Sequence, residues 1–296
     1  MPSRFDTVSF LSDYGHSDEF VGVVHSVIRS IAPQVKIIDV AHGIAAHDTR
    51  AGGLALARAA NYLCPGVVLA VVDPTVGTPR RPVVVEVGDG ASYLIGPDNG
   101  LLAPAVGLVG GATRAIELTS PHHRLPSVTG ATFDGRDVFA PAAAHLCNGV
   151  PLEELGPDID TASLIPGVLP VSQVQGDELV AEVLWIDRFG NCQLNVDPVD
   201  VADFGTTMTV ALPTTTKIGM LVRAYDEIPT GRAGLLVDSS GLLSVAVARG
   251  SAATEFGLDE GDEIRLSATD DGTAQADPRQ SGATIAVEIQ RKGHHL

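Results

Sequence analysis

The sequence predicts an α/β domain with a mostly parallel sheet, followed by a smaller all-β domain. Strand-like and helix-like segments alternate through the first half of the chain, which is typical of a parallel sheet with helices on both faces. From residue 179 onward, short apolar segments punctuated by glycine dominate, which is typical of a small β-sandwich or barrel. A stretch rich in Pro, Gly and Asp separates the halves, so we expect domains at residues 1–170 and 178–296.

The elements of the first domain follow from the periodicity of its apolar residues. The segment TVSFL at 7–11 is expected to be a buried strand, and the apolar residues from Phe20 to Ile31 then share one helical face. Ser17 is positioned as the N-cap of that helix, and Pro33 ends it. We further expect strands at 36–40 and 67–72, helices at 48–62 and 137–148, and a hairpin at 83–95 that turns at Asp89-Gly90.

The second domain is expected to consist of short strands. They are LVAEVLWI (179–186), CQLNV (192–196), TMTVAL (207–212), GLLVD (234–238), LLSVAVA (242–248), DEIRL (262–266) and TIAVEI (284–289). A polar loop at 268–281 precedes the last of them. Trp185, the only tryptophan, is expected in the core of this domain.

Composition disfavours several classes of partner and location. Of the 296 residues, 45% are hydrophobic and 19% are charged, which is enough apolar surface for a sizeable core. No run of 18 uncharged apolar residues and no signal-peptide pattern is found, so we expect a cytoplasmic protein without a membrane span. The formal charge of −17 disfavours nucleic acids and anionic lipids as partners.

Familiar signatures of phosphate, cofactor and metal sites are missing from the sequence. It contains no GxxxxGK[ST] loop, no GxGxxG after the first strand, no HExxH and no GxSxG. Cys64, Cys147 and Cys192 lie far apart without a C-x-x-C pair, and we expect reduced, mostly buried thiols. His122 and His123 are expected to be solvated. The usual enzymes of phosphate transfer, hydride transfer, zinc hydrolysis and serine hydrolysis are therefore disfavoured.

Two carboxylates directly follow predicted strands of the first domain. Asp13 comes after the first strand and Asp73 after the third, and ligands gather at the carboxyl ends of parallel strands. Arg80 stands seven residues after Asp73, in the loop VVDPTVGTPRR at 71–81. Two interpretations are open. Asp73 and Arg80 form an ion pair that only stabilises the loop, or they form the charged base of a pocket that binds a small polar reactant.

Seven blocks occur in order along roughly residues 7–266. They are FLSDYGHSDEFVGVVHSVI, IIDVAHGIAAHDTRAGGLAL, VVLAVVDPTVGTPRRP, GPDNGLL, TFDGRDVFAPAAAHL, IDRFGNCQLNV and DSSGLLSVAVARGSAA. Together they resemble the S-adenosyl-L-methionine hydroxide adenosyltransferases, relatives of the fluorinating and chlorinating enzymes that use the same substrate. The resemblance implies an α/β N-terminal domain and a β-rich C-terminal domain. It also implies a homotrimer whose sites lie between the N-domain of one subunit and the C-domain of a neighbour.

The implied reaction is attack by water or hydroxide on C5′ of S-adenosylmethionine, which releases adenosine and methionine. The sulfonium is a good leaving group, so the site has to hold a nucleophile in line and shield it from solvent. The catalytic residues implied are Asp73, which orients the attacking oxygen, Arg80, which favours hydroxide, and Asp134, with Arg81 as a solvent-side neighbour. Asp134 stands where hydrolytic relatives carry a histidine. It is expected either to replace the imidazole as general base or to mark reduced activity.

The resemblance also implies substrate contacts. Asp13 would accept hydrogen bonds from both ribose hydroxyls, and His47 aligns with a position that lines the ribose in halogenating relatives. Asp18 and Asp187 would face the amino-acid end of the substrate. Phe189 would stack on the adenine ring, unless it belongs to the core, and Asn191 would hydrogen-bond to the adenine edge. Ser239 and Ser240 would lie near the methionine carboxylate. Ala252 would contact adenine through its backbone. Halogenating relatives carry an arginine where Ser240 stands, so carboxylate recognition is weaker here or comes from elsewhere.

Two other functions stay open. A protein that binds S-adenosylmethionine or adenosine without turnover is the first alternative, because Asp134 replaces the histidine. Halide addition is less favoured, because a carboxylate at Asp73 would repel a halide in a dry pocket. Fluorinating relatives carry a tyrosine there and a threonine where Val76 stands. No metal or organic cofactor is expected, and the expected partner besides a second subunit is S-adenosylmethionine.

Overall fold

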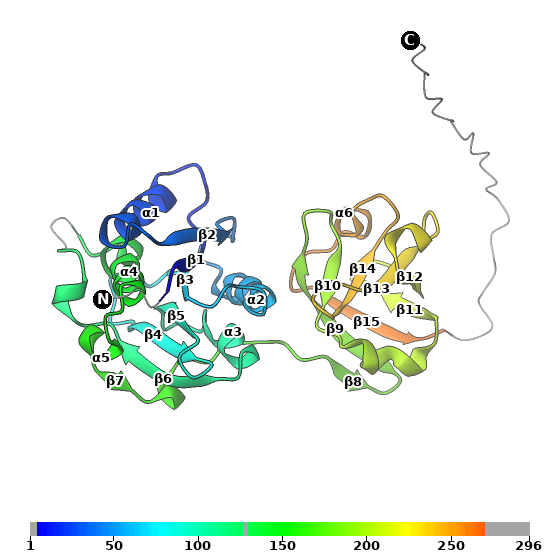
Figure 1. Cartoon of the computed structure of the whole chain (residues 1–296). Coiled ribbons are helices and arrows are strands. Elements are labelled where there is room, and N and C mark those ends of the chain that lie inside the picture. Colours follow the sequence, from blue (N-terminus) through cyan, green and yellow to red (C-terminus); the bar gives the residue numbers. More distant parts are fainter. Residues whose placement is uncertain (1–4, 127–129, 270–296) are drawn as a thin grey trace, which may run out of the picture.

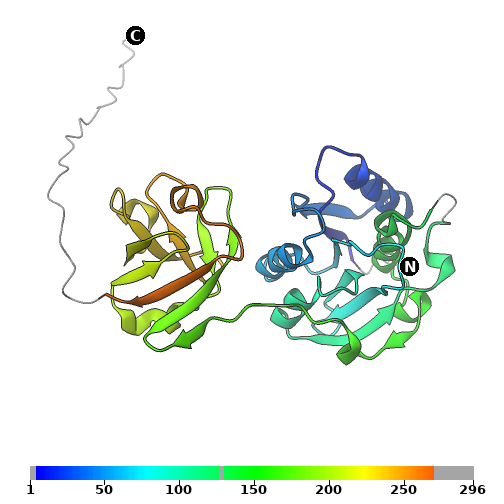
Figure 2. The same ribbon diagram turned by 180° about the vertical axis from the view of Figure 1, so that it is seen from behind.

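The chain folds into two domains joined by an extended linker, as the computed structural model in Figure 1 and Figure 2 shows. The structure describes residues 5–126 and 130–269. The first domain combines a sheet with helices, and the second is built almost wholly of strands. The polar loop expected at 268–281 falls almost wholly outside the described residues, and the strand expected at 284–289 lies outside them entirely. No helix in the described part of the chain is long and apolar enough to cross a membrane.

The sheet of the first domain has seven strands in the order β2-β1-β3-β5-β4-β6-β7. Their bounds are β1 Thr7–Ser12, β2 Lys36–Ala41, β3 Val67–Val71, β4 Pro82–Val87, β5 Ser92–Pro97, β6 Ala112–Glu117 and β7 Asp158–Ile159. Strands β2, β1, β3 and β5 pair in parallel, whereas β4, β6 and β7 join antiparallel. The prediction of a mostly parallel sheet is therefore wrong. The hairpin places β4 antiparallel to β5, and β6 and β7 then add to the sheet beyond β4 in antiparallel pairs.

Helices cover both faces of this sheet. Helices α1 (Phe20–Ile31) and α4 (Ala140–Cys147) pack on one face, where Phe10 and Leu69 lie fully buried. Helices α2 (Thr49–Ala60) and α3 (Ala103–Leu108) pack on the other. The remaining helical turns are Pro121–His123, Gly135–Phe139, α5 Leu152–Leu155, Thr161–Ser163, Pro198–Phe204, Tyr225–Glu227 and α6 Ala252–Phe256.

Local signals predicted most of these elements but not all of their ends. Helix α2 begins as expected after Asp48, whose carboxylate accepts a hydrogen bond from the Ala51 amide at 2.8 Å. Helix α1 begins only at Phe20, after Glu19, so Ser17 is not its N-cap. The helix expected at 137–148 is preceded by a π-helical turn from Gly135 to Phe139.

The second domain is a closed barrel. Its strands are β8 Gln173–Gln175, β9 Glu178–Ile186, β10 Cys192–Leu194, β11 Thr207–Ala211, β12 Thr216–Leu221, β13 Ala233–Val237, β14 Leu243–Ala246 and β15 Glu263–Ala268. Seven of them, β9 to β15, form a ring that the pairing of β10 with β9 closes. The expected all-β domain is confirmed, although β8 and β12 were not predicted. Trp185 lies only partly buried and outside the barrel core, which contradicts its expected position.

The linker is fastened to the first domain by an ion pair. Arg81 binds Asp98, with 2.9 Å between Nε and Oδ2, and also donates to the Ser163 carbonyl at 2.6 Å. The other oxygen of Asp98 accepts the Ile165 amide at 2.8 Å. Asp98 is buried, so Arg81 does not stand as a solvent-side neighbour of Arg80 as expected; it holds residues 163–165 against the sheet. Cys147 and Cys192 are buried as predicted, whereas Cys64 is exposed.

Candidate active site

Two neighbouring strands deliver carboxylates to one edge of the sheet. Strands β1 and β3 pair in parallel with Ser12 opposite Val71, so Asp13 and Asp73 leave the sheet at the same end. The Asp13 amide donates to the Val71 carbonyl at 3.3 Å, which keeps the two chain segments together beyond the strands. This is the edge at which loops of an α/β sheet converge on a ligand.

Arg80 binds both Asp73 and Asp134. Its Nε lies 3.2 Å from Asp73 Oδ1, its Nη2 contacts Asp73 Oδ2, and the same Nη2 lies 2.7 Å from Asp134 Oδ2. The Arg80 and Asp73 side chains are each 5% exposed and that of Asp134 is 20% exposed. The three residues predicted to act together are therefore brought together, in a nearly buried cluster that we call the Arg80 cluster.

A glycine lets the two chain segments of the Arg80 cluster approach each other. Gly77 has φ +80°, and a Cβ added there would lie 2.9 Å from the Ala131 carbonyl oxygen. The loop that carries Asp73 and Arg80 is therefore packed directly against the segment that leads into Asp134. The π-helical turn begins at the next residue, a local geometry that often occurs at functional sites.

The Arg80 cluster retains an unsatisfied donor. Arg80 Nη1 is buried, and among the described residues it has no hydrogen-bond partner. A buried guanidinium N–H without an acceptor is costly, so this atom is a ready donor to an oxygen that enters the site. Burial raises the pKa of Asp73 above its ordinary value; the charge of Arg80 opposes this shift and that of Asp134 adds to it.

Tyr14 also belongs to this site, and sequence reasoning missed it. Burial raises the pKa of its phenol far above the ordinary value, and the charges of Asp13, Asp73 and Asp134 add to that effect. The hydroxyl lies where a side chain on Gly135 would begin. Tyr14 is thus a neutral hydrogen-bond donor among carboxylates. Its position directly after Asp13 was the available signal.

The contact between Tyr14 and Gly135 leads to a first prediction. Gly135→Ala should lower stability by about 1–3 kcal/mol, because the new methyl group overlaps the Tyr14 hydroxyl. Tyr14→Phe removes that oxygen, so the double variant should recover most of the loss. Urea unfolding of the two single variants and the double variant measures this. A double variant as unstable as Gly135→Ala would show that the hydroxyl does not occupy this position.

The predicted ribose residues are partly assembled. Asp13 Oδ2 accepts the His47 amide at 2.9 Å, and the His47 side chain is exposed beside it. Asp13 keeps lone pairs for further donors, since a carboxylate offers about four acceptor sites. Asp18 is exposed in the loop before α1, and no hydrogen bond or ion pair joins it to the Arg80 cluster in the described part of the chain.

Three of the residues predicted in the second domain, Asp187, Asn191 and Ser239, line a separate pocket. This barrel pocket has a volume of about 400 Å³, and its lining includes Trp185, Asp187, Asn191, Tyr225 and Ser239. Asp187 organises the turn beside it, because its carboxylate accepts the Asn191 amide at 2.9 Å and the Asn191 side chain at 2.8 Å. The side-chain hydrogen bond uses Asn191 Nδ2, so Asp187 leaves the side-chain oxygen of Asn191 unused.

Three other residues predicted to contact the substrate, Phe189, Ser240 and Ala252, are not part of the lining of the barrel pocket. Phe189 is 75% exposed, which excludes the core position considered for it. Ser240 is exposed, and its amide donates to Asp238 at 2.8 Å. Ala252 is fully buried in the barrel core, so only its backbone is available to a ligand.

The two domains meet along helix α2. Helix α2 is the element of the first domain that faces the barrel (Figure 1), and Arg58 stacks on the Trp185 ring with 4.0 Å from Cζ to the ring centroid. Arg50 binds Glu182 at 2.5 Å across the same boundary. No hydrogen bond or ion pair between described residues links the Arg80 cluster to the barrel pocket.

Fold and site together define a two-domain protein in which a mixed α/β domain carries a buried carboxylate–guanidinium cluster and a β-barrel carries a separate polar pocket. The chain belongs to the SAM hydroxide adenosyltransferase family, whose N-terminal domain matches residues 8–156 and whose C-terminal domain matches residues 181–265. The resemblance seen in the sequence is therefore confirmed.

Relatives span nearly the whole chain. It is 41% identical over 261 residues to an (R)-S-adenosyl-L-methionine hydrolase of Salinispora arenicola, covering 88% of this chain and 97% of that protein. A Thermus thermophilus protein of the same name is 42% identical over 266 residues, covering 88% and 98%. A fluorinase of Actinopolyspora mzabensis is 27% identical, covering 88% and 96%. The crystal structure of an uncharacterized conserved protein from Thermotoga maritima matches with a TM-score of 0.80 at 32% identity, covering 88% and 99%.

Proposed function

We propose that this protein hydrolyses (R)-S-adenosyl-L-methionine to adenosine and L-methionine. The observation that carries the proposal is the Arg80 cluster, a nearly buried set of charges with one unsatisfied N–H, in a chain of this family. The names of its 41–42% identical relatives support the same substrate and reaction. The proposed reaction uses no metal or organic cofactor, because a sulfonium leaves as a neutral thioether without an acid.

The proposed mechanism is a single in-line displacement. A water molecule accepts a hydrogen bond from Arg80 Nη1 and donates one to the Asp73 carboxylate, which aims its oxygen at C5′. As the C5′–O bond forms, the C5′–S bond breaks and its electron pair returns to sulfur, giving methionine. The proton of the attacking water passes to the carboxylate pair of Asp73 and Asp134. The raised pKa of Asp73 makes it a better acceptor than an exposed aspartate.

Substrate binding in this proposal combines both domains. Asp13 takes the ribose hydroxyls, with His47 beside the sugar and Asp18 at the amino-acid end. Asp187, Asn191 and Ser239 in the barrel pocket take the adenine and methionine groups. Phe189, Ser240 and the backbone at Ala252 would add contacts from outside the lining of that pocket. In the part of the chain that the structure describes, no hydrogen bond or ion pair links the Arg80 cluster to the barrel pocket, and we propose a homotrimer in which a neighbour supplies the barrel.

One assay tests the function. Purified protein is incubated with (R)-S-adenosyl-L-methionine, with and without fluoride or chloride, and the products are separated by liquid chromatography. Adenosine and methionine in equal amounts are expected under all conditions. A 5′-halo nucleoside would instead assign a halogenase, and intact bound substrate would assign a binding protein, the alternative that Asp134 suggests.

The role of Asp134 can be tested by restoring the imidazole of the hydrolytic relatives. Asp134→His should retain hydrolysis within about tenfold, because an imidazole is also a general base. Its rate should gain a new dependence on a group titrating at about pH 6.5, falling below that pH as the imidazole is protonated. The measurement is kcat against pH for both proteins. Complete inactivity of a folded variant would mean that the carboxylate at this position cannot be exchanged.

The subunit arrangement predicts complementation between inactive variants. Asp73→Asn damages the first domain and Asn191→Ala the second, so each homotrimer should be impaired. If each site combines two subunits, an equal mixture reassembled from dissociated chains should recover about a quarter of the wild-type site number. If each site lies within one chain, every site keeps one defect and no recovery is expected. Activity after mixing, against each variant treated alone, distinguishes the two.

A further inference from the structure

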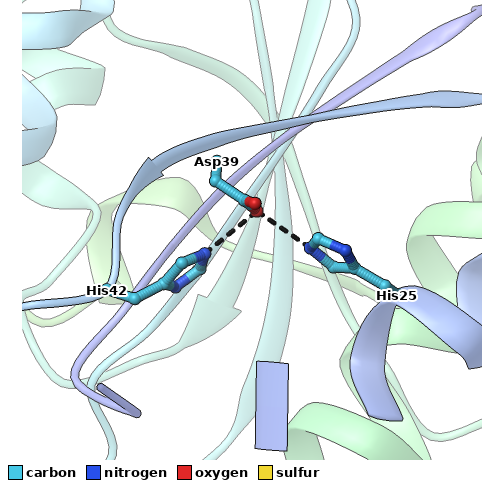
Figure 3. A group of neighbouring side chains, drawn as sticks. All are labelled: His25, Asp39 and His42. Carbon is cyan, nitrogen blue, oxygen red and sulfur yellow. Dashed lines mark hydrogen bonds and ion pairs between the residues drawn. The ribbon is translucent and has the colours of Figure 1, made fainter. Parts of the chain in front are cut away.

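Two histidines and an aspartate outside the Arg80 cluster converge on one point. His25 comes from α1, Asp39 from β2 and His42 from the residue after β2, as Figure 3 shows. Both Nε2 atoms approach the same carboxylate oxygen, at 2.8 Å for His25 and 3.0 Å for His42. One donor atom from each residue lies within 4.8 Å of the other two.

The His42 ring is held in place from behind. The side chain is buried, and its Nδ1 lies 2.7 Å from Ser12 Oγ, while Phe10 packs against it with 4.6 Å between ring centroids. When Nδ1–H donates to Ser12, the lone pair on Nε2 points toward Asp39. A metal-binding histidine usually has this arrangement, with its second ring nitrogen held by an oxygen.

We propose that His25, Asp39 and His42 form a binding site for a divalent transition-metal cation of the Zn²⁺ type. Imidazole nitrogens with one carboxylate suit Zn²⁺, Co²⁺ or Ni²⁺, whereas Mg²⁺ and Ca²⁺ prefer sets of oxygens. A tetrahedral Zn²⁺ with ligands at about 2.0 Å separates neighbouring ligand atoms by about 3.3 Å. The nitrogen–oxygen distances of 2.8 and 3.0 Å therefore need only small side-chain shifts to reach that separation.

Solvent can complete the coordination of such a cation. The side chains of Asp39 and His25 are 45% and 29% exposed, so an ion can enter and water can take the remaining position. The three residues belong to a helix, a strand and the loop after it. A bound cation would thus fasten α1 to the edge strand β2 of the sheet.

The site adjoins the loop that carries Asp13. Ser12 contacts the His42 ring, and the Gly15 amide donates to the His42 carbonyl at 2.7 Å. His42 therefore holds the chain on both sides of Asp13 and Tyr14. Cation binding should stiffen this loop, but the binding itself does not depend on the proposed hydrolysis.

The test is a titration of the full chain with Zn²⁺, followed by calorimetry. Because His294 and His295 near the C-terminus could bind metal independently, all proteins carry glutamine at both positions. We expect one equivalent of Zn²⁺ to bind with a rise in melting temperature. Titration with Co²⁺ should give the visible absorption of a nitrogen- and oxygen-ligated ion.

His25 and Asp39 are the ligands to replace, because their side chains reach solvent and can change without emptying the core, whereas Ser12 is buried and loses only its hydroxyl. His25→Gln and Asp39→Asn should each weaken Zn²⁺ binding about 100-fold, and Ser12→Ala about tenfold through the His42 ring. His122→Gln, at an exposed histidine elsewhere, is the matched control and should bind as the parent does. No saturable binding, or equal affinity in His25→Gln, Asp39→Asn and the control, would show that the three residues only hydrogen-bond α1 to β2.

Discussion

Asp73→Asn should lower kcat for S-adenosylmethionine hydrolysis by about 10²–10⁴-fold while the affinity for the substrate changes little. The amide keeps the size of the side chain but cannot accept the proton of the attacking water. Single-turnover kinetics and equilibrium binding of the substrate separate these effects. Because burial raises the Asp73 pKa, the wild-type rate should fall as pH drops through a value above the ordinary range of an aspartate.

Asp89→Asn is the control for this variant. Asp89 is exposed at the tip of the β4–β5 hairpin, with φ 52°, a conformation that asparagine tolerates. Its kinetics should match the wild type. An Asp73→Asn protein that hydrolyses at the wild-type rate would contradict the proposed role of the carboxylate, whatever its affinity.

Arg80→Met should abolish detectable hydrolysis and lower the free energy of unfolding by about 3–5 kcal/mol. The side chain is 5% exposed and binds two carboxylates, so its loss leaves Asp73 and Asp134 facing each other without a counter-charge. The destabilisation should be smaller at low pH, where Asp73, whose pKa is raised in the folded state, becomes protonated and uncharged. Urea unfolding at two pH values measures the change.

Arg114→Met provides the comparison for Arg80→Met. Arg114 also binds two carboxylates, Asp158 and Glu153, but these groups are largely exposed. Solvent screens them, so this variant should stay close to the wild type in stability and activity. Equal losses in the two variants would mean that burial of the Arg80 cluster has no energetic consequence.

The sequence predicted elements better than their pairing. Buried apolar runs identified β1 and β3, and Asp89-Gly90 identified the β4–β5 hairpin. Strand β6, ATRAIE, has charged side chains that hide its apolar alternation, and its partner β4 lies far away in the chain. Which strands pair depends on tertiary contacts that no local pattern records, so the mixed sheet was not foreseen.

In the candidate site, too, contacts within one loop could be predicted, whereas contacts that depend on the tertiary structure could not. Asp73 and Arg80 lie on one short loop, so their proximity could be predicted from spacing. The partner of Arg81 could not, because Asp98 reaches it only through the antiparallel pairing of β4 with β5. Tyr14 was not predicted because its role depends on burial among carboxylates. The positions of charged residues along the sequence do not show which uncharged side chain is buried beside them.

The ion pair of Arg81 with Asp98 bears on how such chains can be recombined. Two adjacent residues of one loop have different partners. Arg80 binds the carboxylates of the Arg80 cluster, whereas Arg81 and its partner Asp98 hydrogen-bond to residues 163–165. In a chimaera that takes its barrel from a relative, the crossover point therefore belongs after residue 165. A junction placed upstream would replace residues 163–165. The Arg81 guanidinium would then lose its native partner at Ser163, one peptide bond away from Arg80.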